Sequence, residues 1–473
     1  MKILSSVLSL SLAFGLAVPC LGLAAPAAQF FGENPLTADA NVGVLVVDVH
    51  TGEVIDAYGD NRLLPTASTM KVLTTSTALE LLGESFQWST CLETDGDIVD
   101  GVLQGNLYVR GSGDPSLCSR KLASGDFLAE CASQLLSLGV GKVSGQVVAD
   151  LSAWNNDEAV NPGWLWEDMG NYYASGVYPL SFQDNTLHVY LASGDSASVA
   201  SVLKTEPSVD GLLVESRVRC TGVKGDNAYG YGRPMDAYRL LTGEIPSNRG
   251  MFRVKLDMPD PGLVLAQQLR ARLLEAGVAV DGAASSSTVP AASPRRVLFE
   301  HRSPVLSAVV AETNLNSNNL FAESVFRSLA SDEAGSLAVA RSRVVECWRG
   351  RGVDLSHSII VDGSGLAPQN GLSPQNLVGV LRYMYRSPHF GDLLASLPVA
   401  GRSGTLKSFL AGSRLAGKVY AKSGTIAHLK AYAGYIFVDD KRVWAFSMVV
   451  NNAAGSNREV QKLIERYLLS LVR

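Results

Sequence analysis

The spacing of three short polar motifs constrains the fold of this chain most strongly. Ser68-Thr69-Met70-Lys71 stands near the N-terminus, whereas Ser317-Asn318-Asn319 and Lys422-Ser423-Gly424 lie in the last third of the 473 residues. Their hydroxyl, amine and amide groups act together only if they meet in one cleft. Because 249 residues separate Ser68 from Ser317, the intervening chain must leave the domain that carries Ser68 and return to it. Such insertions are tolerated because the two ends of a fold often lie close together.

The flanking sequence distinguishes the first motif from a second Ser-x-x-Lys copy. Ser68 opens an apolar pattern typical of a helix, which places Lys71 one turn later on the same face. The second copy, Ser201 with Lys204, runs into Thr205-Glu206-Pro207-Ser208, which the sequence predicts to be a turn. We therefore assign the chemistry to the first copy.

The other two motifs also have favourable contexts. Ser-x-Asn occurs once, at Ser317 and Asn319, before a helical pattern. Lys422 ends a short apolar strand, and a second apolar strand follows at 431–438. The near-copy Arg402-Ser403-Gly404 is predicted to lie in a loop.

These residue types predict nucleophilic catalysis. A serine hydroxyl attacks well only when a base takes its proton, and Lys71 is a base for Ser68 only when its amine is neutral. Burial and nearby positive charge both lower a lysine pKa, and we expect Lys422 to supply that charge across the cleft. Ser317 can pass the proton to a leaving nitrogen, and Asn319 can hold Lys71 and a substrate amide.

The third motif predicts substrate binding. Lys422 and Ser423 can bind a terminal carboxylate, and Gly424 permits close approach of the substrate backbone. The backbone N–H groups of Ser68 and Thr425 can form an oxyanion hole. The alternative is purely structural: Ser68 and Asn319 only cap helices and Lys422 is an exposed strand end.

Other function classes lack support in the sequence. The net charge is −5 and no basic run marks a nucleic-acid surface. The six histidines are scattered without a His-Glu-x-x-His motif, so we expect no bound metal. The sequence also has no phosphate-binding loop, so we expect no nucleotide cofactor. A Gly-x-Ser-x-Gly nucleophile elbow is also missing from the sequence.

The N-terminus predicts export. A charged Met1-Lys2, an apolar stretch over 3–23 and small residues over 24–28 resemble a secretory signal peptide, which we place at 1–27, with an uncleaved anchor as the alternative. No later segment is long enough to span a bilayer. The expected location is the periplasm or cell-wall space.

Export permits disulfides among the five remaining cysteines. An odd number leaves at least one free thiol, for which Cys347 is our choice, and Cys118 with Cys131 is the most local pair. The pairing itself is not readable from sequence among Cys91, Cys118, Cys131, Cys220 and Cys347.

The apolar patterns divide the chain by texture. A hairpin is predicted over 40–60, short strands over 85–283, and helices over 305–385 with a turn-rich break at 362–374. An amphipathic helix over 458–472 closes the chain, and we expect it to pack on the catalytic sheet rather than anchor to a membrane.

Together with further landmarks, the motifs resemble the D-alanyl-D-alanine carboxypeptidase/endopeptidase family of class C, low-mass penicillin-binding proteins. The likeness covers nearly the whole mature chain. The landmarks are Gly-Ser-Gly-Asp-Pro at 111–115, Trp-Leu-Trp-Glu-Asp-Met at 164–169, Gly-Asn-Tyr-Tyr at 170–173, Asp-Gly-Ser-Gly-Leu at 362–366, Leu-Pro-Val-Ala-Gly at 397–401 and Gly-Thr-Leu at 404–406.

The resemblance implies an α+β multidomain fold. Its penicillin-recognising serine transferase domain is an antiparallel sheet flanked by helices, with two smaller nested domains in a large, mostly β insertion. We expect the catalytic domain at 28–85 and 290–473, an inserted domain at 86–112 and 186–289, and a nested domain at 113–185.

The resemblance also implies the reaction. Serine hydrolases of this family cleave D-Ala-D-Ala or the D-Ala-diaminopimelate cross-link of peptidoglycan peptides, and β-lactams acylate the same serine. It further suggests that Asp168 binds the free amine of the diaminopimelyl side chain. The alternative is that Trp164 and Trp166 are core anchors and Asp168 a capping residue.

The sequence departs from the family pattern at three positions. Ser423 stands where Thr is usual, Asn318 where Asp is common, and Ala367-Pro368 where relatives often place a polar or basic residue. Because Ser423 keeps the hydroxyl, its function should survive. The change at 367–368 removes any expected substrate contact there.

Two rival hypotheses remain at this point: a β-lactamase, against which the large insertion argues, and a non-catalytic wall-binding scaffold, against which the intact motifs argue. Expected partners are peptidoglycan peptides ending in D-Ala-D-Ala or cross-linked through diaminopimelate, with β-lactams as inhibitors. We also expect no nucleic acid, at most peripheral membrane contact, and either a monomer or a homodimer.

Overall fold

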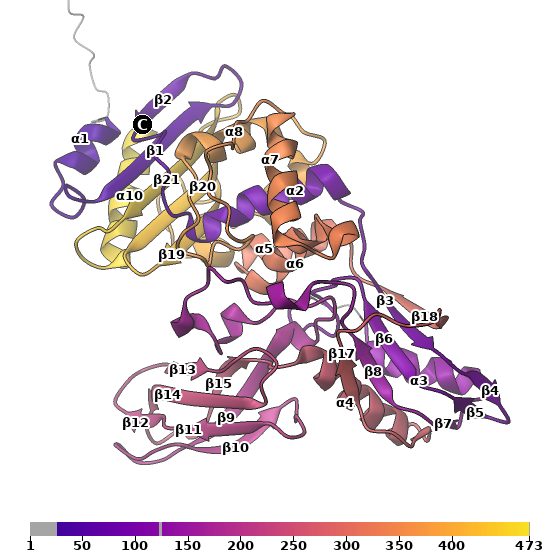
Figure 1. Cartoon of the computed structure of the whole chain (residues 1–473). Coiled ribbons are helices and arrows are strands. Elements are labelled where there is room, and N and C mark those ends of the chain that lie inside the picture. The colour runs from indigo at the N-terminus through magenta and orange to yellow at the C-terminus, as the bar shows by residue number, and fades with distance from the viewer. Residues whose placement is uncertain (1–25, 123–124, 473) are drawn as a thin grey trace, which may run out of the picture.

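The computed structural model describes residues 26–122 and 125–472 (Figure 1). The predicted signal peptide therefore lies almost entirely outside the described residues. Within the described part of the chain, no helix is both long enough and apolar enough to cross a membrane.

A five-stranded antiparallel sheet joins the two ends of the chain. Its strand order is β19-β20-β21-β1-β2, so the N-terminal hairpin pairs with the C-terminal strands. The predicted hairpin is confirmed. The strands are β1 (Asn41–Asp48), β2 (Val54–Tyr58), β19 (Val419–Ile426), β20 (Leu429–Phe437) and β21 (Val443–Asn451).

Both faces of this sheet are covered by helices, which explains why its strands are apolar at almost every position. Along β1, Leu45 and Val47 point into one core, whereas Val44 and Val46 point into the other. The first core lies against α2 (Met70–Leu82), α5 (Leu306–Leu315), α6 (Asn319–Ser328), α7 (Leu337–Arg349), α8 (Pro374–Met384) and α9 (Phe390–Ser396).

The second core lies against the terminal helices α1 (Ala27–Gly32) and α10 (Asn457–Leu471). The apolar stripe of α10 is buried in it, with Leu463, Ile464 and Tyr467 fully enclosed. The prediction that the last helix packs on the catalytic sheet is confirmed.

The inserted region forms sheets of its own (Figure 1). A five-stranded sheet has the order β17-β8-β6-β3-β18, and α4 (Pro261–Glu275) packs on it. Its strands are β3 (Ser89–Thr94), β6 (Leu107–Gly111), β8 (Val147–Asp150), β17 (Ser285–Ser287) and β18 (Arg296–Arg302). A smaller sheet pairs β4 (Asp97–Val99), β5 (Val102–Gln104), β7 (Lys142–Val143) and β16 (Ala279–Val280), and α3 (Phe127–Ser137) lies against α4.

Strands between residues 186 and 257 form two sheets, and Leu256 also bridges to Asn171 outside them. One sheet has the order β10-β9-β15, from β9 (Thr186–Ser193), β10 (Ser201–Glu206) and β15 (Gly250–Asp257). The other contains β11 (Leu213–Ser216), β12 (Arg219–Thr221), β13 (Asn227–Tyr231) and β14 (Tyr238–Pro246). The exact domain limits given above stay a prediction.

Two local expectations differ from the structure. Thr205 and Glu206, predicted to begin a turn after the second Ser-x-x-Lys copy, lie in strand β10, because pairing with β9 outweighs the turn preference of this segment. Lys204 is engaged there with Glu206, because its Nζ donates to Glu206 Oε1 at 2.6 Å. The five described cysteines are all unpaired, so no disulfide forms among them.

Candidate active site

The candidate nucleophile lies at the start of a buried helix. A short 3-10 turn, η1 (Ala67–Thr69), carries Ser68 and runs directly into α2. No side-chain cap bond is made at this helix start, so the alternative that Ser68 only caps the helix has no support. Every residue from Met70 to Leu79 is buried, which holds Lys71 in a fixed position one turn beyond Ser68.

Three oxygen atoms surround the Lys71 amine. Its Nζ lies 2.9 Å from Ser68 Oγ, 2.7 Å from Asn319 Oδ1 and 2.7 Å from the carbonyl oxygen of Ser364. A carbonyl oxygen can only accept hydrogen bonds, and the same holds for an amide oxygen. A neutral lysine amine has two N–H groups, which these two oxygens use, so its lone pair is left facing Ser68 Oγ.

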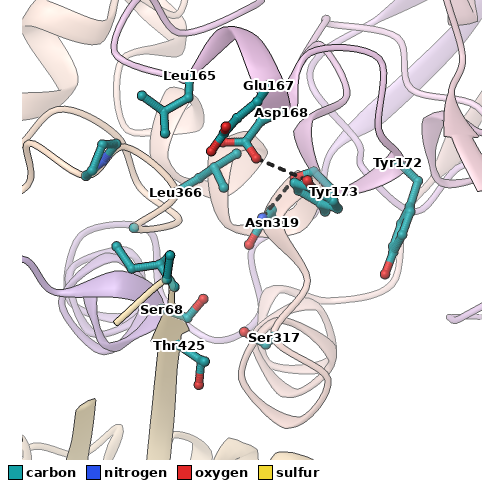
Figure 2. A pocket seen from close by; sticks show the side chains of 14 residues that line it. Ser68, Leu165, Glu167, Asp168, Tyr172, Tyr173, Ser317, Asn319, Leu366 and Thr425 are labelled. Atoms are coloured by element: carbon teal, nitrogen blue, oxygen red, sulfur yellow. Dashed lines mark hydrogen bonds between the residues drawn. The ribbon is translucent and has the colours of Figure 1, made fainter. Parts of the chain in front are cut away.

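The orientation of the Asn319 amide is fixed by another part of the chain. Its Nδ2 donates to the backbone carbonyl of Tyr173 at 2.8 Å, 146 residues away in sequence (Figure 2). Because the nitrogen is held there, the amide oxygen must face Lys71. Tyr173 is thus a positioning residue, and its role here could not be found from the motifs.

Burial sets the basicity of Lys71. Its side chain is fully enclosed, and this desolvation lowers its pKa to about 7, opposed by the negative charges of Asp362 and Glu323. The expectation that Lys422 supplies the lowering charge is therefore not met. The loss of hydration dominates instead, because no water replaces the solvation of a fully buried ammonium.

Lys422 lies on the central sheet beside the second motif. It is fully buried in β19, and its Nζ donates to Ser317 Oγ at 2.9 Å and to the carbonyl of Ser423 at 2.8 Å. Burial first, and then the charges of Lys71 and Lys430, hold its pKa well below the usual range. It is a buried partner of Ser317 and not the exposed strand end of the structural alternative.

Ser317 and Asn319 occupy a tight connection between α5 and α6. Ser317 adopts a left-handed backbone conformation with φ of +58°, which is uncommon for a residue other than glycine. Asn318 caps α6 by accepting a hydrogen bond from the Phe321 N–H, so the capping role belongs to Asn318. Asn319 is left free to face Lys71.

Strand β19 passes directly beside the nucleophile. A Cβ atom added at Gly424 would lie 2.9 Å from the Thr66 carbonyl oxygen and 3.1 Å from the Ser68 nitrogen. Glycine is therefore required for this close approach. The predicted oxyanion hole uses the N–H groups of Ser68 and of Thr425, the residue after this contact.

Two hydroxyl contacts extend the third motif. Ser423 Oγ donates to Thr405 Oγ1 at 2.7 Å, and Lys430 Nζ donates to Thr425 Oγ1 at 2.8 Å. Thr405 belongs to the Gly-Thr-Leu landmark beside the near-copy of the motif, so its position in the sequence offered a clue to its place in the site. Lys430 belongs to none of the motifs, so the sequence analysis did not identify it as a site residue.

A buried acidic pair supports the carbonyl that faces Lys71. Asp362 accepts five hydrogen bonds, from Trp164 Nε1, Asn370 Nδ2 and Ser364 Oγ and from the backbone nitrogens of Gly365 and Ala367. Glu323 accepts from the Ser364 nitrogen at 2.7 Å. Burial and the neighbouring Asp362 charge raise the pKa of Glu323 to about 8.

A cavity of about 500 Å³ opens over these groups (Figure 2). Ser68, Ser317, Asn319 and Thr425 line one side of it. The other side is formed by the inserted region and by the turn after the Asp-Gly-Ser-Gly-Leu segment, through Leu165, Glu167, Asp168, Tyr172, Tyr173, Leu366 and Pro368.

Asp168 reaches this cavity. It ends the 3-10 turn η3 (Trp166–Asp168), and its Oδ1 accepts a hydrogen bond from the Tyr173 hydroxyl at 3.1 Å. Burial, and to a smaller extent the charge of Glu167, raises its pKa. The alternative that both tryptophans are core anchors holds for Trp164, which is buried, but not for Trp166, which is 65% exposed. Across the described ranges, no cluster of three or more His, Cys, Asp or Glu side chains could hold a metal ion.

The sequence of the chain matches one protein family over almost its full length. The model of the D-Ala-D-Ala carboxypeptidase 3 (S13) family covers residues 28–470. The chain belongs to this family. It is 29% identical to a D-alanyl-D-alanine carboxypeptidase of an Actinomadura species over 446 residues, 89% of this chain and 80% of that protein.

Further relatives agree in sequence and in fold. The chain is 25% identical to the D-alanyl-D-alanine carboxypeptidase DacB of Haemophilus influenzae over 436 residues, 90% of this chain and 88% of that protein. The crystal structure of penicillin binding protein 4 (dacB) from the same species superposes with a TM-score of 0.80 at 21% identity, covering 94% of this chain and 99% of that one.

Family and fold together decide the class of the protein. It is a hydrolase of the serine D-alanyl-D-alanine carboxypeptidase type, with the penicillin-recognising serine fold. The two rival hypotheses, a β-lactamase and a non-catalytic scaffold, are not favoured by these relatives. Pro368, where relatives often have a polar or basic residue, makes that part of the cavity wall apolar.

Proposed function

We propose that this enzyme cleaves D-Ala-D-Ala termini or D-Ala-diaminopimelate cross-links of peptidoglycan peptides through an acyl-enzyme on Ser68. The observation that carries the proposal is the environment of the Lys71 amine. Two acceptor-only oxygens and a pKa of about 7 together favour a neutral base whose lone pair faces Ser68 Oγ. A serine hydroxyl with such a base is an activated nucleophile.

The first half-reaction follows from this geometry. Lys71 takes the Ser68 proton as Oγ attacks the carbonyl carbon of the scissile bond, and the oxygen that becomes negative is held by the N–H groups of Ser68 and Thr425. The tetrahedral intermediate then collapses, and its C–N bond breaks. Ser317, hydrogen-bonded to Lys422, gives its proton to the leaving nitrogen. The proton that Lys71 took from Ser68 then returns to Ser317 through Lys422, so Lys71 is neutral again before the second half-reaction.

The second half-reaction releases the acyl group. Water attacks the ester carbon, Lys71 accepts its proton, and Ser68 Oγ leaves and is reprotonated, which restores the starting state. The terminal carboxylate of a carboxypeptidase substrate binds to Lys422, Ser423 and Thr405, a role that the contacts among these residues support.

We further propose that Asp168 binds the free amine of a diaminopimelyl side chain. The carboxylates of Asp168 and Glu167 both line the cavity wall that faces Ser68, so a cationic group in the substrate would meet negative charge there. This contact favours diaminopimelate-containing peptides and allows endopeptidase as well as carboxypeptidase action. The predicted export signal and these substrates agree with work in the periplasm or cell-wall space.

The first experiment is intact-mass spectrometry after incubation with benzylpenicillin. A complex of penicillin binding protein 4 from Haemophilus influenzae with a β-lactam, whose fold matches with a TM-score of 0.75, supports this choice of probe. We expect one covalent adduct on the wild type and none on Ser68→Ala. Rapid penicillin loss without an adduct would indicate a β-lactamase, and intact penicillin without an adduct would refute the proposal.

The second experiment tests substrate choice. We expect Asp168→Asn to raise KM for peptides with a diaminopimelyl amine and to leave KM for their acetylated counterparts unchanged. An equal effect on both peptides would show that Asp168 supports the cavity wall without binding the amine.

A further inference from the structure

A second cavity adjoins the catalytic cleft and is lined mainly by basic residues. Its volume is about 240 Å³, and Arg120, Lys121, Arg253 and Lys255 line it. A smaller cavity of about 120 Å³ connects it to the cleft, since it shares Lys121 with the second cavity and Ser317 and Asn319 with the cleft. Tyr172 lines all three.

Strand alternation explains the position of two of these cations. Arg253 and Lys255 lie two residues apart on β15, so they project from the same face of the sheet. Lys255 pairs directly with His188 on β9, and its Nζ lies 5.0 Å from the centre of the Tyr172 ring. Arg120 approaches from another loop and donates to His188 Nδ1 at 2.5 Å.

These cations have no carboxylate partner. Among the described residues, none of the four forms an ion pair within 4 Å, although Arg120 also donates to Gln183 Oε1. One carboxylate, Asp184, also lines the pocket, and it accepts hydrogen bonds from Ser119 Oγ and the Arg120 backbone N–H. Three further carboxylates lie near these cations: Glu206, which is bonded to Lys204 and Tyr190, Asp226 near Lys255, and Glu312 near Lys121. The lining therefore keeps an excess of positive charge.

The behaviour of His188 agrees with this field. Burial first, and then the charges of Arg120, Arg253 and Lys255, lower its pKa to about 4. The ring is therefore neutral at pH 7. Unpaired like charges repel one another and destabilise a fold, so a group of them at a cavity indicates a site for an anion.

We propose that this cationic pocket, defined by Arg120, Lys121, Arg253 and Lys255, binds a free carboxylate of the peptide that is cut at Ser68. The proposal rests on the proposed function. Arginine and lysine are the side chains that recognise carboxylates, and the pocket is continuous with the cleft through Tyr172.

Charge complementarity points to the same occupant. The cleft wall carries the carboxylates of Glu167 and Asp168, and the connected pocket carries the cations. A peptide with both a free amine and a free carboxylate can bind the acidic cleft wall and the cationic pocket at the same time. These two contacts fix the orientation of the peptide in the cleft. The small volume of the pocket suits a single carboxylate group rather than a length of polymer.

The test compares two double variants. Arg253→Gln/Lys255→Gln removes two cations from the pocket, and Arg296→Gln/Lys441→Gln removes two exposed cations elsewhere as the matched control. Substrates are peptides whose acidic residue carries either a free carboxylate or a carboxamide. We expect the pocket variant to raise KM about tenfold for the carboxylate peptide, and to change KM for the carboxamide peptide less than twofold.

Two further measurements sharpen the test. Lys121→Gln, which lies in the connecting cavity, should give a smaller loss with the same preference, and 0.5 M salt should reduce the difference between the two peptides. Substrates with the carboxylate on the acyl-donating strand or only on the departing strand show which strand occupies the pocket, and an effect on either supports the proposal.

The outcomes separate this inference from the proposed function. Benzylpenicillin acylation of Ser68 should be the same in both double variants and the wild type, because penicillin reacts at the Ser68 end of the cleft. If the wild type is not acylated, the proposed function fails. If acylation is intact but the pocket variant affects both peptides equally, or neither, the cationic pocket binds no substrate carboxylate.

Discussion

The pH dependence of acylation should report the titration of Lys71. Because burial lowers its pKa from 10.5 to about 7, the folded protein disfavours the charged amine by about 5 kcal/mol. The sign follows directly: the base works only when neutral, so the rate should rise with pH through the pKa. Lys71 is about one tenth neutral at pH 6 and about nine tenths neutral at pH 8, so the acylation rate should rise about tenfold between them.

The assay is the second-order rate constant of benzylpenicillin acylation from pH 5 to pH 9, followed by intact mass. Glu323→Gln is the informative variant, because the amide oxygen can still accept the Ser364 N–H but carries no charge. Because the pKa of Glu323 is raised to about 8, this carboxyl group is mostly uncharged at the Lys71 midpoint, so its removal should move that midpoint only slightly, to lower pH.

Two results would refute this reasoning. A midpoint above pH 9 would mean that Lys71 stays charged in the resting enzyme and that burial is not the dominant influence. A Glu323→Gln profile shifted to higher pH would mean that the carboxyl group does not stabilise the Lys71 ammonium. Ser68→Ala supplies the baseline, with no adduct at any pH.

Three further predictions concern packing around the site. Asp362→Asn keeps one acceptor oxygen and loses at least two of five hydrogen bonds, so urea denaturation should show a loss of about 3–6 kcal/mol in the free energy of unfolding. Gly424→Ala places a methyl group 2.9 Å from the Thr66 carbonyl oxygen and should slow acylation at least about tenfold, with little change in the melting temperature. Arg239→Met leaves Asp257 buried without its 2.5 Å partner, which should cost about 3–5 kcal/mol by denaturation. Penicillin acylation at 25 °C should persist in the folded fraction of that variant, since this pair lies in the inserted region.

Local sequence was sufficient where one segment decides its own structure. The hairpin β1–β2, the helical segment that follows Ser68 and the apolar stripe of α10 are set by nearby residues and their periodicity, and the structure has all three. The order of the motifs also required an inserted region. These features depend on contacts between sequence neighbours or on chain connectivity alone.

Predictions from local sequence failed where pairing with another strand, or bonding between distant residues, determines the structure. Thr205 and Glu206 belong to a predicted turn, yet pairing with β9 makes them part of strand β10. Export permits disulfides, but the five described cysteines stay unpaired in the fold. Neither outcome can be read from the local sequence, because each depends on which distant segment lies beside it.

The sequence by itself determined which residues could form the site and that the intervening chain must be an insertion. Only the tertiary structure decided their chemical state. Tyr173 orients Asn319, the Ser364 carbonyl uses a second N–H of Lys71, and enclosure lowers the Lys71 pKa. The cationic pocket likewise joins residues from separate segments, at 120–121 and 253–255. Charge and basicity depend on burial and on neighbours brought together by folding, and neither is a property of a motif.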